Sequence, residues 1–114
     1  MKLKEIVEQL NLEILAGDTN LDLDINGGYV SDILSDVMAK AQQGDLWITN
    51  QAHQNVVALA FFRRLTGVII TDNINPEPEA LEKAIEHRIP LLKTQQSAFD
   101  VVGQLYQMGI RGKK

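Results

Sequence analysis

The sequence predicts an α/β domain in which a mixed, mostly parallel β-sheet is flanked by helices. Two observations predict this fold class. Over the last three-quarters of the chain, strand-like segments alternate with segments that carry apolar residues at helical spacing, which is the pattern of βαβ units. One strand-like segment, Gly67–Thr71, contains a continuous apolar run, which is typical of a parallel strand covered on both faces. Because 114 residues suffice for one core and leave a second core undersized, we expect a single domain over residues 1–114.

The first quarter of the chain predicts one helix and one short strand. Four apolar residues at helical spacing predict a helix that ends near Asn11: Leu3, Ile6, Val7 and Leu10. Residues 12–15 alternate like a strand, and residues 16–18 indicate a turn. Apolar and polar residues alternate from Thr19 to Asn26, which predicts a half-exposed extended segment. Gly27-Gly28 then indicates a bend or a close approach of the backbone.

The next elements form the first βα unit. Tyr29-Val30 is a brief strand, and either Ser31 or Asp32 can cap the helix that follows it. Gly44 provides the stop after that helix. The apolar residues of this helix keep the helical spacing: Leu34, Val37, Met38 and Ala41.

The centre of the chain predicts a second unit with a largely buried helix. Residues 45–49 read as a strand, and the helix runs from about Gln54 to Leu65. Its interior, Val56–Phe62, is apolar on every side, which predicts a helix buried on most of its surface. The apolar strand Gly67–Thr71 follows this helix.

The last third predicts two more helices around a strand. Pro76 and Pro78 fix the start of a helix, since proline suits a first helical turn that needs no N–H. Residues 89–94 supply a strand, and Ser97 with Asp100 forms a capping box for the final helix, which stops at Gly109. Residues 110–114 are expected to fray. The apolar faces of the two helices comprise Leu81, Ala84 and Ile85 in one and Ala98, Val101, Val102 and Leu105 in the other.

Composition and charge exclude several classes of function. The chain has no cysteine, which removes thiol catalysis, iron–sulfur clusters and cysteine-ligated zinc. With 11 basic and 15 acidic residues the net charge is −4, so we expect no nucleic-acid partner and no anionic membrane surface. No apolar stretch is long enough to span a membrane, and the acidic turn at Glu5 argues against a secretory signal. A soluble cytoplasmic protein is therefore expected.

Polar residues follow every strand of the predicted parallel sheet. The carboxyl ends of such strands meet at one edge, where loops converge and ligands bind. The same residue types also cap helices, so capping alone and capping with ligand contact remain open alternatives. Two of the loops contain more asparagine and glutamine side chains than helix capping explains. Such amide groups favour the recognition of neutral polar groups. We name these candidate ligand-binding residues the strand-end rim: Ser31, Asp32, Thr49, Asn50, His53, Thr71, Asp72, Asn73 and Thr94.

Signals for catalysis or metal binding are weak. His53 is the one rim side chain able to exchange protons near neutral pH, although a histidine at a helix start also serves as a cap. A Ser-His-Asp set of Ser97, His53 and Asp72 lacks the G-x-S-x-G elbow, and the phosphate-loop and H-E-x-x-H motifs are absent. Residues 18–26 lack the glycine and glutamate of a calcium loop and read as a solvated acidic edge segment. His87, near a helix C-terminus, reads as structural. We expect no catalytic residue, no metal site and no cofactor.

Several blocks of the sequence, in register, resemble a DRTGG domain over nearly the whole chain. They are Gly27–Ala39, Gly44–Thr49 and Gly67–Thr71, followed by residues 76–78, 89–92 and 97–99. Such domains are similar to the N-terminal domain of the HPr serine kinase/phosphorylase and, through it, to the N-terminal domains of Mur ligases. The resemblance implies a cytoplasmic accessory or regulatory α/β module of the kind attached to CBS pairs, phosphotransacetylase-type enzymes or a kinase. The kinase's phosphate loop belongs to its other domain, so kinase activity does not carry over.

The chain departs from this family at the residues that name it. The literal Asp-Arg-Thr is replaced by Ala52-His53-Gln54, and the Gly-Gly by Asp72-Asn73. An arginine fork suited to anions thus becomes a histidine with amides, which predicts a different ligand.

Three functional hypotheses follow. The first is a non-catalytic regulatory or ligand-sensing module that binds a small polar ligand, such as a nucleotide, and acts on a partner enzyme in trans or as a homodimer. The alternative is a protein-interaction or oligomerisation subunit without a small ligand. An enzyme acting alone would require His53 at hydrogen-bond distance from a carboxylate.

Overall fold

The computed structural model describes residues 1–112 and contains one five-stranded sheet in the order β1-β5-β4-β3-β2. The strands β2 to β5 are parallel neighbours, and β1 pairs antiparallel with β5. The predicted mixed, mostly parallel sheet is therefore confirmed. The elements are α1 (Leu3–Leu10), β1 (Glu13–Ala16), the 3₁₀ turn η1 (Asp18–Asn20), β2 (Gly27–Val30), α2 (Leu34–Lys40), β3 (Asp45–Thr49), α3 (Gln54–Phe62), β4 (Gly67–Ile70), α4 (Pro78–His87), β5 (Leu91–Lys93) and α5 (Ala98–Gln107).

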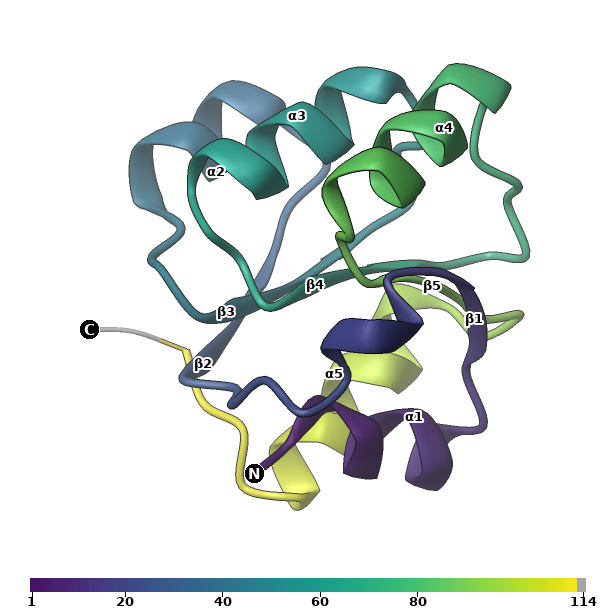
Figure 1. The fold of residues 1–114 in the computed structure, drawn as a ribbon. Coiled ribbons are helices and arrows are strands. Elements are labelled where there is room, and N and C mark those ends of the chain that lie inside the picture. Colours follow the sequence, from purple (N-terminus) through teal and green to yellow (C-terminus); the bar gives the residue numbers. More distant parts are fainter. Residues whose placement is uncertain (113–114) are drawn as a thin grey trace.

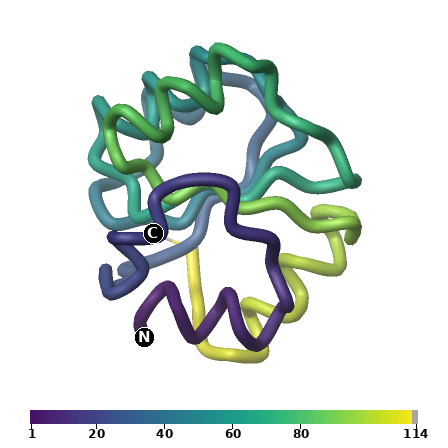
Figure 2. The backbone as a smooth tube through the Cα atoms, turned by 45° about the vertical axis from the view of Figure 1, so that its right-hand side comes forward, coloured from purple at the N-terminus to yellow at the C-terminus, as the bar shows by residue number. Residues whose placement is uncertain are grey.

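Helices cover both faces of the sheet and enclose two apolar cores. Helices α2, α3 and α4 lie on one face, and α1 and α5 lie on the other (Figure 1, with a second view in Figure 2). Successive side chains of a strand point to opposite faces. In β3, Trp47 accordingly joins the core under α2, α3 and α4, whereas Leu46 and Ile48 join the core under α1 and α5. This two-sided burial explains the continuous apolar runs of the central strands.

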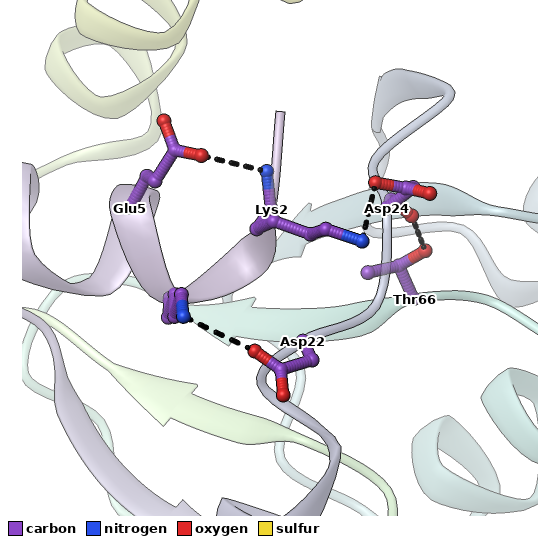
Figure 3. A network of polar contacts seen from close by, with 6 residues as sticks. Lys2, Glu5, Asp22, Asp24 and Thr66 are labelled. Atoms are coloured by element: carbon purple, nitrogen blue, oxygen red, sulfur yellow. Dashed lines mark hydrogen bonds and ion pairs between the residues drawn. The ribbon is translucent and has the colours of Figure 1, made fainter.

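The segment between η1 and β2 is wrapped around the N-terminus instead of forming the predicted extended segment over 19–26. Its β pairing among residues 1–112 is the single bridge Lys2–Asp24, and backbone bonds join Leu3 N–H to Leu23 O at 2.9 Å. Figure 3 shows Lys2 paired with Asp24 at 3.1 Å and the Thr66 hydroxyl donating to the Asp24 carbonyl at 2.8 Å. Asp22 pairs with Lys4 at 3.3 Å. The carboxylates are solvated as expected, but they hold the N-terminal helix rather than protect a strand edge.

The glycine pair and the C-terminal tail also differ from the prediction. Gly27 and Gly28 lie within β2, so they make no bend. The expected close approach is present, because a Cβ on Gly28 would lie 3.2 Å from Ile110 Cγ2. The Gly28 N–H donates to the Arg111 carbonyl at 3.0 Å, and Ile110 is buried. The prediction of a frayed tail is wrong for residues 110–112, and residues 113–114 lie outside the described part of the chain.

Three helix ends and parts of three predicted apolar faces also differ from the prediction. Helix α2 has Ile33 at its N-cap with no side-chain cap, so neither Ser31 nor Asp32 caps it; it ends at Lys40, four residues before Gly44. Helix α3 ends at Phe62, which is 70% exposed. The outward side of α3 is uncovered, because the sheet and two neighbouring helices reach only its other sides. Met38 and Ile85, predicted on apolar faces, are likewise 41% and 59% exposed.

Other local predictions are confirmed. Pro78 occupies the first turn of α4, and the Ser97 side chain accepts the Asp100 N–H at 3.3 Å as the cap of α5. Among residues 1–112 no helix is long and apolar enough to cross a membrane.

Candidate ligand-binding site at the strand ends

The carboxyl ends of β2, β3, β4 and β5 lie at one edge of the sheet, because these four strands are parallel. Ser31 and Asp32 follow β2, Thr49 and Asn50 end and follow β3, and the residues 71–73 and Thr94 follow β4 and β5. Backbone bonds connect neighbouring ends, for example from Thr71 N–H to the Thr49 carbonyl at 3.0 Å. The topology therefore places the strand-end rim along one continuous edge.

Asp32 links the carboxyl ends of β2 and β3 by hydrogen bonds. Its Oδ1 accepts the Thr49 hydroxyl at 2.8 Å and the Asn50 backbone N–H at 2.9 Å. Thr49 Oγ1 in turn accepts the Gln51 N–H at 3.1 Å. Because one carboxylate oxygen accepts both hydrogen bonds, Asp32 in the loop after β2 fixes the start of the loop after β3. Asp32 Oδ2 receives no hydrogen bond from residues 1–112.

The loops after β4 and β5 are joined by backbone bonds. Asp72 N–H donates to the Gln96 carbonyl and Asn73 N–H to the Thr94 carbonyl, each at 2.9 Å. Both donors adopt left-handed backbone conformations, with φ of 63° for Asp72 and 58° for Asn73. Glycine adopts this conformation without cost, and Asn and Asp are the residues that tolerate it next best. The family has Gly-Gly where this chain has Asp72-Asn73. The backbone at these two positions keeps the left-handed conformation that glycine favours, and this chain adopts it with two polar side chains.

Two rim residues make side-chain hydrogen bonds to residues close to them in the sequence. The Ser31 hydroxyl accepts the N–H of Ile33 at 3.1 Å, within its own loop. His53 caps α3, with its Nδ1 accepting the Asn55 N–H at 3.0 Å. Within residues 1–112 His53 makes no ion pair with a carboxylate and no hydrogen bond with Asp72 or Ser97, so the His–carboxylate pair and the Ser-His-Asp set are not assembled.

A polar cavity of about 380 Å³ opens where the rim meets β1. The chain after β4 leads to α4 on one face of the sheet, and the chain after β5 leads to α5 on the other (Figure 1). Loops that diverge to opposite faces leave a crevice between the strand ends, and such crevices bind ligands in open α/β sheets. The cavity is lined by Asn11, Glu13, Asn73, Lys93, Thr94, Gln95 and Gln96.

The cavity offers polar groups of several kinds. Gln96 Oε1 is buried and has no hydrogen-bond partner among residues 1–112. The residue Gln96 lines the cavity, but this buried oxygen is not exposed to it. Lys93 Nζ donates to Asn75 Oδ1, and Glu13 on β1 lies opposite Lys93 in the strand pair. The one cation and the one carboxylate balance, so the cavity offers hydrogen-bonding groups without a net charge.

A second polar pair stabilises the neighbouring end of β2. The Tyr29 hydroxyl donates to Asp36 Oδ2 at 2.6 Å, and Lys40 pairs with the other carboxylate oxygen at 3.1 Å. The hydrogen bond from Tyr29, with a smaller contribution from Lys40, lowers the pKa of Asp36. The same hydrogen bond, burial and the nearby carboxylate raise the pKa of Tyr29. This pair couples β2 to α2 beside the Asp32 hydrogen bonds.

Five cavity residues were not predicted as part of the rim: Asn11, Glu13, Lys93, Gln95 and Gln96. Asn11 and Glu13 come from the N-terminal segment, and only the antiparallel pairing of β1 with β5 brings them to the strand ends. No local sequence signal indicates that pairing. The glutamines of the loop after β5 did carry a signal, since they belong to the surplus of amides. The described residues hold no group of three or more His, Asp or Glu side chains arranged to bind a metal ion.

Comparison with known proteins identifies a family and a solved structure of similar fold. A family model described as the DRTGG domain matches residues 5–108. A solved structure of the CBS and DRTGG domains of the regulatory region of Clostridium perfringens pyrophosphatase, complexed with its activator diadenosine tetraphosphate, is similar with a TM-score of 0.76 and 18% identity. The match covers 93% of this chain and 46% of that chain, so the present chain spans less than half of its relative. A search of curated proteins found no match.

Proposed function

This chain belongs to the DRTGG domain family, and on that premise we propose that it is a non-catalytic regulatory module that senses a small polar ligand and acts on a partner protein. The observation that carries the proposal is the polar cavity of about 380 Å³ at the ends of β4 and β5, which is lined by amide, hydroxyl and charged side chains. The similarity to a regulatory region that binds a nucleotide activator supports nucleotides as the first ligand class to test.

Within the strand-end rim we assign direct ligand contact to Asn73 and Thr94, which line the cavity. Thr71 and Asp72 shape its wall, because the Thr71 hydroxyl donates to Asp72 Oδ2 at 2.8 Å and Asp72 is bonded to the opposite loop. The rest of the rim, Ser31, Asp32, Thr49, Asn50 and His53, holds the adjoining loops. Amides recognise the polar edge of a base, and Lys93 provides the charge for a phosphate.

A thermal-shift screen tests this proposal. The full chain is melted with adenosine, AMP, ATP and diadenosine tetraphosphate, and at least one compound is expected to raise Tm in a concentration-dependent way. Gln96→Leu is expected to abolish that rise, while its own Tm stays equal or increases because an unpaired buried acceptor is removed. Gln43→Leu, an exposed loop glutamine outside the cavity, is the matched control. If no compound shifts the wild-type Tm at saturation, the nucleotide proposal is wrong.

The second candidate, a homodimer, is favoured by an apolar surface beside β2, the edge strand opposite β1. Phe99 is 87% exposed and Tyr106 57%, beside Val30 on the outermost strand β2. These side chains surround a hollow of about 680 Å³. An edge strand beside an apolar patch suits an isologous contact with a second copy, which would remove both from water.

Light scattering after size exclusion tests the dimer. We expect the wild type to dimerise at micromolar concentration and Phe99→Ser to be monomeric. Ile85→Ser removes an exposed apolar side chain elsewhere and should leave the mass unchanged. A wild-type monomer at all concentrations contradicts this candidate.

A further inference from the structure

The outward side of α3 carries large apolar side chains that nothing in residues 1–112 covers. Phe62 is 70% exposed and Phe61 52%, and Met38 on α2 is 41% exposed. Single exposed apolar residues are ordinary, but a contiguous exposed group marks an interaction surface.

These side chains lie in two adjoining cavities of about 670 and 600 Å³, which share Phe61, Phe62 and His87. We call them together the α3 groove. Helix α3 lies between α2 and α4 (Figure 1), and residues of all three helices line the first cavity. The second cavity continues past the end of α3 to residues 88–90 and to Asn20 and Leu23. The lining follows helical spacing in all three elements: Leu34 and Met38 on α2, Asn55, Ala58, Leu59 and Phe62 on α3, and Lys83 and His87 on α4.

The groove is basic in an acidic chain. Lys83, Arg64 and Arg88 line it together with His87, and among residues 1–112 no aspartate or glutamate lines either cavity. The whole chain carries a net charge of −4. Glu86 lies beside the groove, with its carboxylate 3.8 Å from His87 Nε2. The His87 ring stacks on Phe61 with centroids 4.3 Å apart, which keeps the imidazole on the groove wall.

We propose that the α3 groove is the docking site for an acidic amphipathic helix of a partner protein. An apolar floor with helical spacing accepts anchors at positions i, i+3 or i+4, and i+7 of an incoming helix, and basic walls select acidic flanks. Such a partner complements the groove's charge, whereas a basic helix would be repelled.

A second copy of this chain does not supply such a helix. The chain's two acidic amphipathic helices, α1 and α4, bury their apolar faces in the two cores. Offering either face to another copy would require that helix to leave its core.

The inference deepens the proposed function, because a regulatory module needs a surface for the protein on which it acts. No residue of the strand-end rim lines the groove. Ligand binding and helix docking can therefore fail separately: a Phe62→Ser variant should keep the nucleotide-induced Tm shift, and a Gln96→Leu variant should keep peptide binding.

Fluorescence anisotropy with two designed peptides tests the inference. Each peptide has about 14 residues, long enough for roughly four helical turns, with leucines on one face. One carries glutamates on its flanks, and the other carries lysines at the same positions. We expect the acidic peptide to bind at least about tenfold more tightly than the basic one, with affinity falling as salt rises.

Variants of the full chain locate the binding. Phe62→Ser should weaken the acidic peptide about tenfold, and Lys83→Glu should weaken it while improving the basic peptide. The controls Ile85→Ser, exposed on α4 outside the groove, and Lys4→Glu, which makes the same charge change on α1, should leave both affinities unchanged. Circular dichroism melts verify that all four variants fold. Equal affinity for the two peptides, absence of binding, or equal loss in the controls overturns the proposal, as does conversion of a wild-type dimer to a monomer by Phe62→Ser.

Discussion

Asp32 joins two strand ends through a single carboxylate oxygen. Its position after β2 followed from the sequence, since Asp is a common residue at such a turn. Its partners did not, because Thr49 and Asn50 lie 17 and 18 residues further along the chain. A local pattern identifies which residues can accept an N–H, whereas the donor that reaches them is set by strand register.

The Tyr29–Asp36 pair predicts a pH-dependent contribution to stability. The lowered pKa of Asp36 means that its contribution is present above the pKa of the unfolded chain and is lost as pH falls through the folded value. The raised pKa of Tyr29 means that its contribution is present at lower pH and is lost as pH rises through the folded value.

Tyr29→Phe removes this pair and should lower Tm most between about pH 5 and 9. The difference from the wild type should shrink below about pH 4 and above about pH 10. Melting curves across this range measure the effect, and Tyr106→Phe, an exposed tyrosine without this partner, is the control. A Tm difference that stays constant with pH contradicts the assignment.

Among the helices and strands, the C-terminal end of α4 contains a residue in an unfavourable backbone conformation. Arg88 is the C-cap residue of α4 and has φ 56°, a left-handed conformation that favours glycine. The Asn20 side chain donates to the Arg88 carbonyl at 2.7 Å, a bond that does not depend on the arginine side chain.

Arg88→Gly should therefore stabilise the protein by about 1 kcal/mol, because relief of left-handed strain exceeds the entropy cost of glycine. Arg88→Ala keeps a Cβ and should give no gain. Urea unfolding of both variants measures the difference. A stability of Arg88→Gly at or below that of Arg88→Ala contradicts this account.

Helices and strands were largely predictable, because hydrophobic periodicity reports which residues face a core. The segment 19–26 was not, since its alternating leucines belong to a loop held by the N-terminus rather than to a strand. Helix α3 was predicted as buried because an all-apolar helix has no polar face to indicate solvent. Its exposed Phe61 and Phe62 are the feature that distinguishes an interaction surface from a core.

At the scale of the whole molecule, strand order determines the site. The sequence predicted parallel strands and therefore a shared polar edge, which accounts for Asn73 and Thr94 in the cavity. It gave no indication that β1 pairs antiparallel with β5 and brings Asn11 and Glu13 there. Contacts between the two ends of a chain depend on global packing, so the part of the cavity lined by Asn11 and Glu13 could be found only in the folded structure.

The two proposed surfaces lie apart in the fold. The cavity opens at the carboxyl ends of β4 and β5, and the α3 groove follows the outward side of the helical layer. Helix α3 begins next to the rim, where His53 caps it, and ends in the groove at Phe62.

We propose above that the cavity at the ends of β4 and β5 binds a nucleotide. An NMR titration of the ¹⁵N-labelled full chain with the compound from the thermal screen that raises Tm most tests this binding directly. We expect saturable shifts of the backbone amides of Asn73, Thr94, Gln95 and Gln96, and their loss in Gln96→Leu. Saturable shifts confined to other surfaces, or none at millimolar nucleotide, would contradict it.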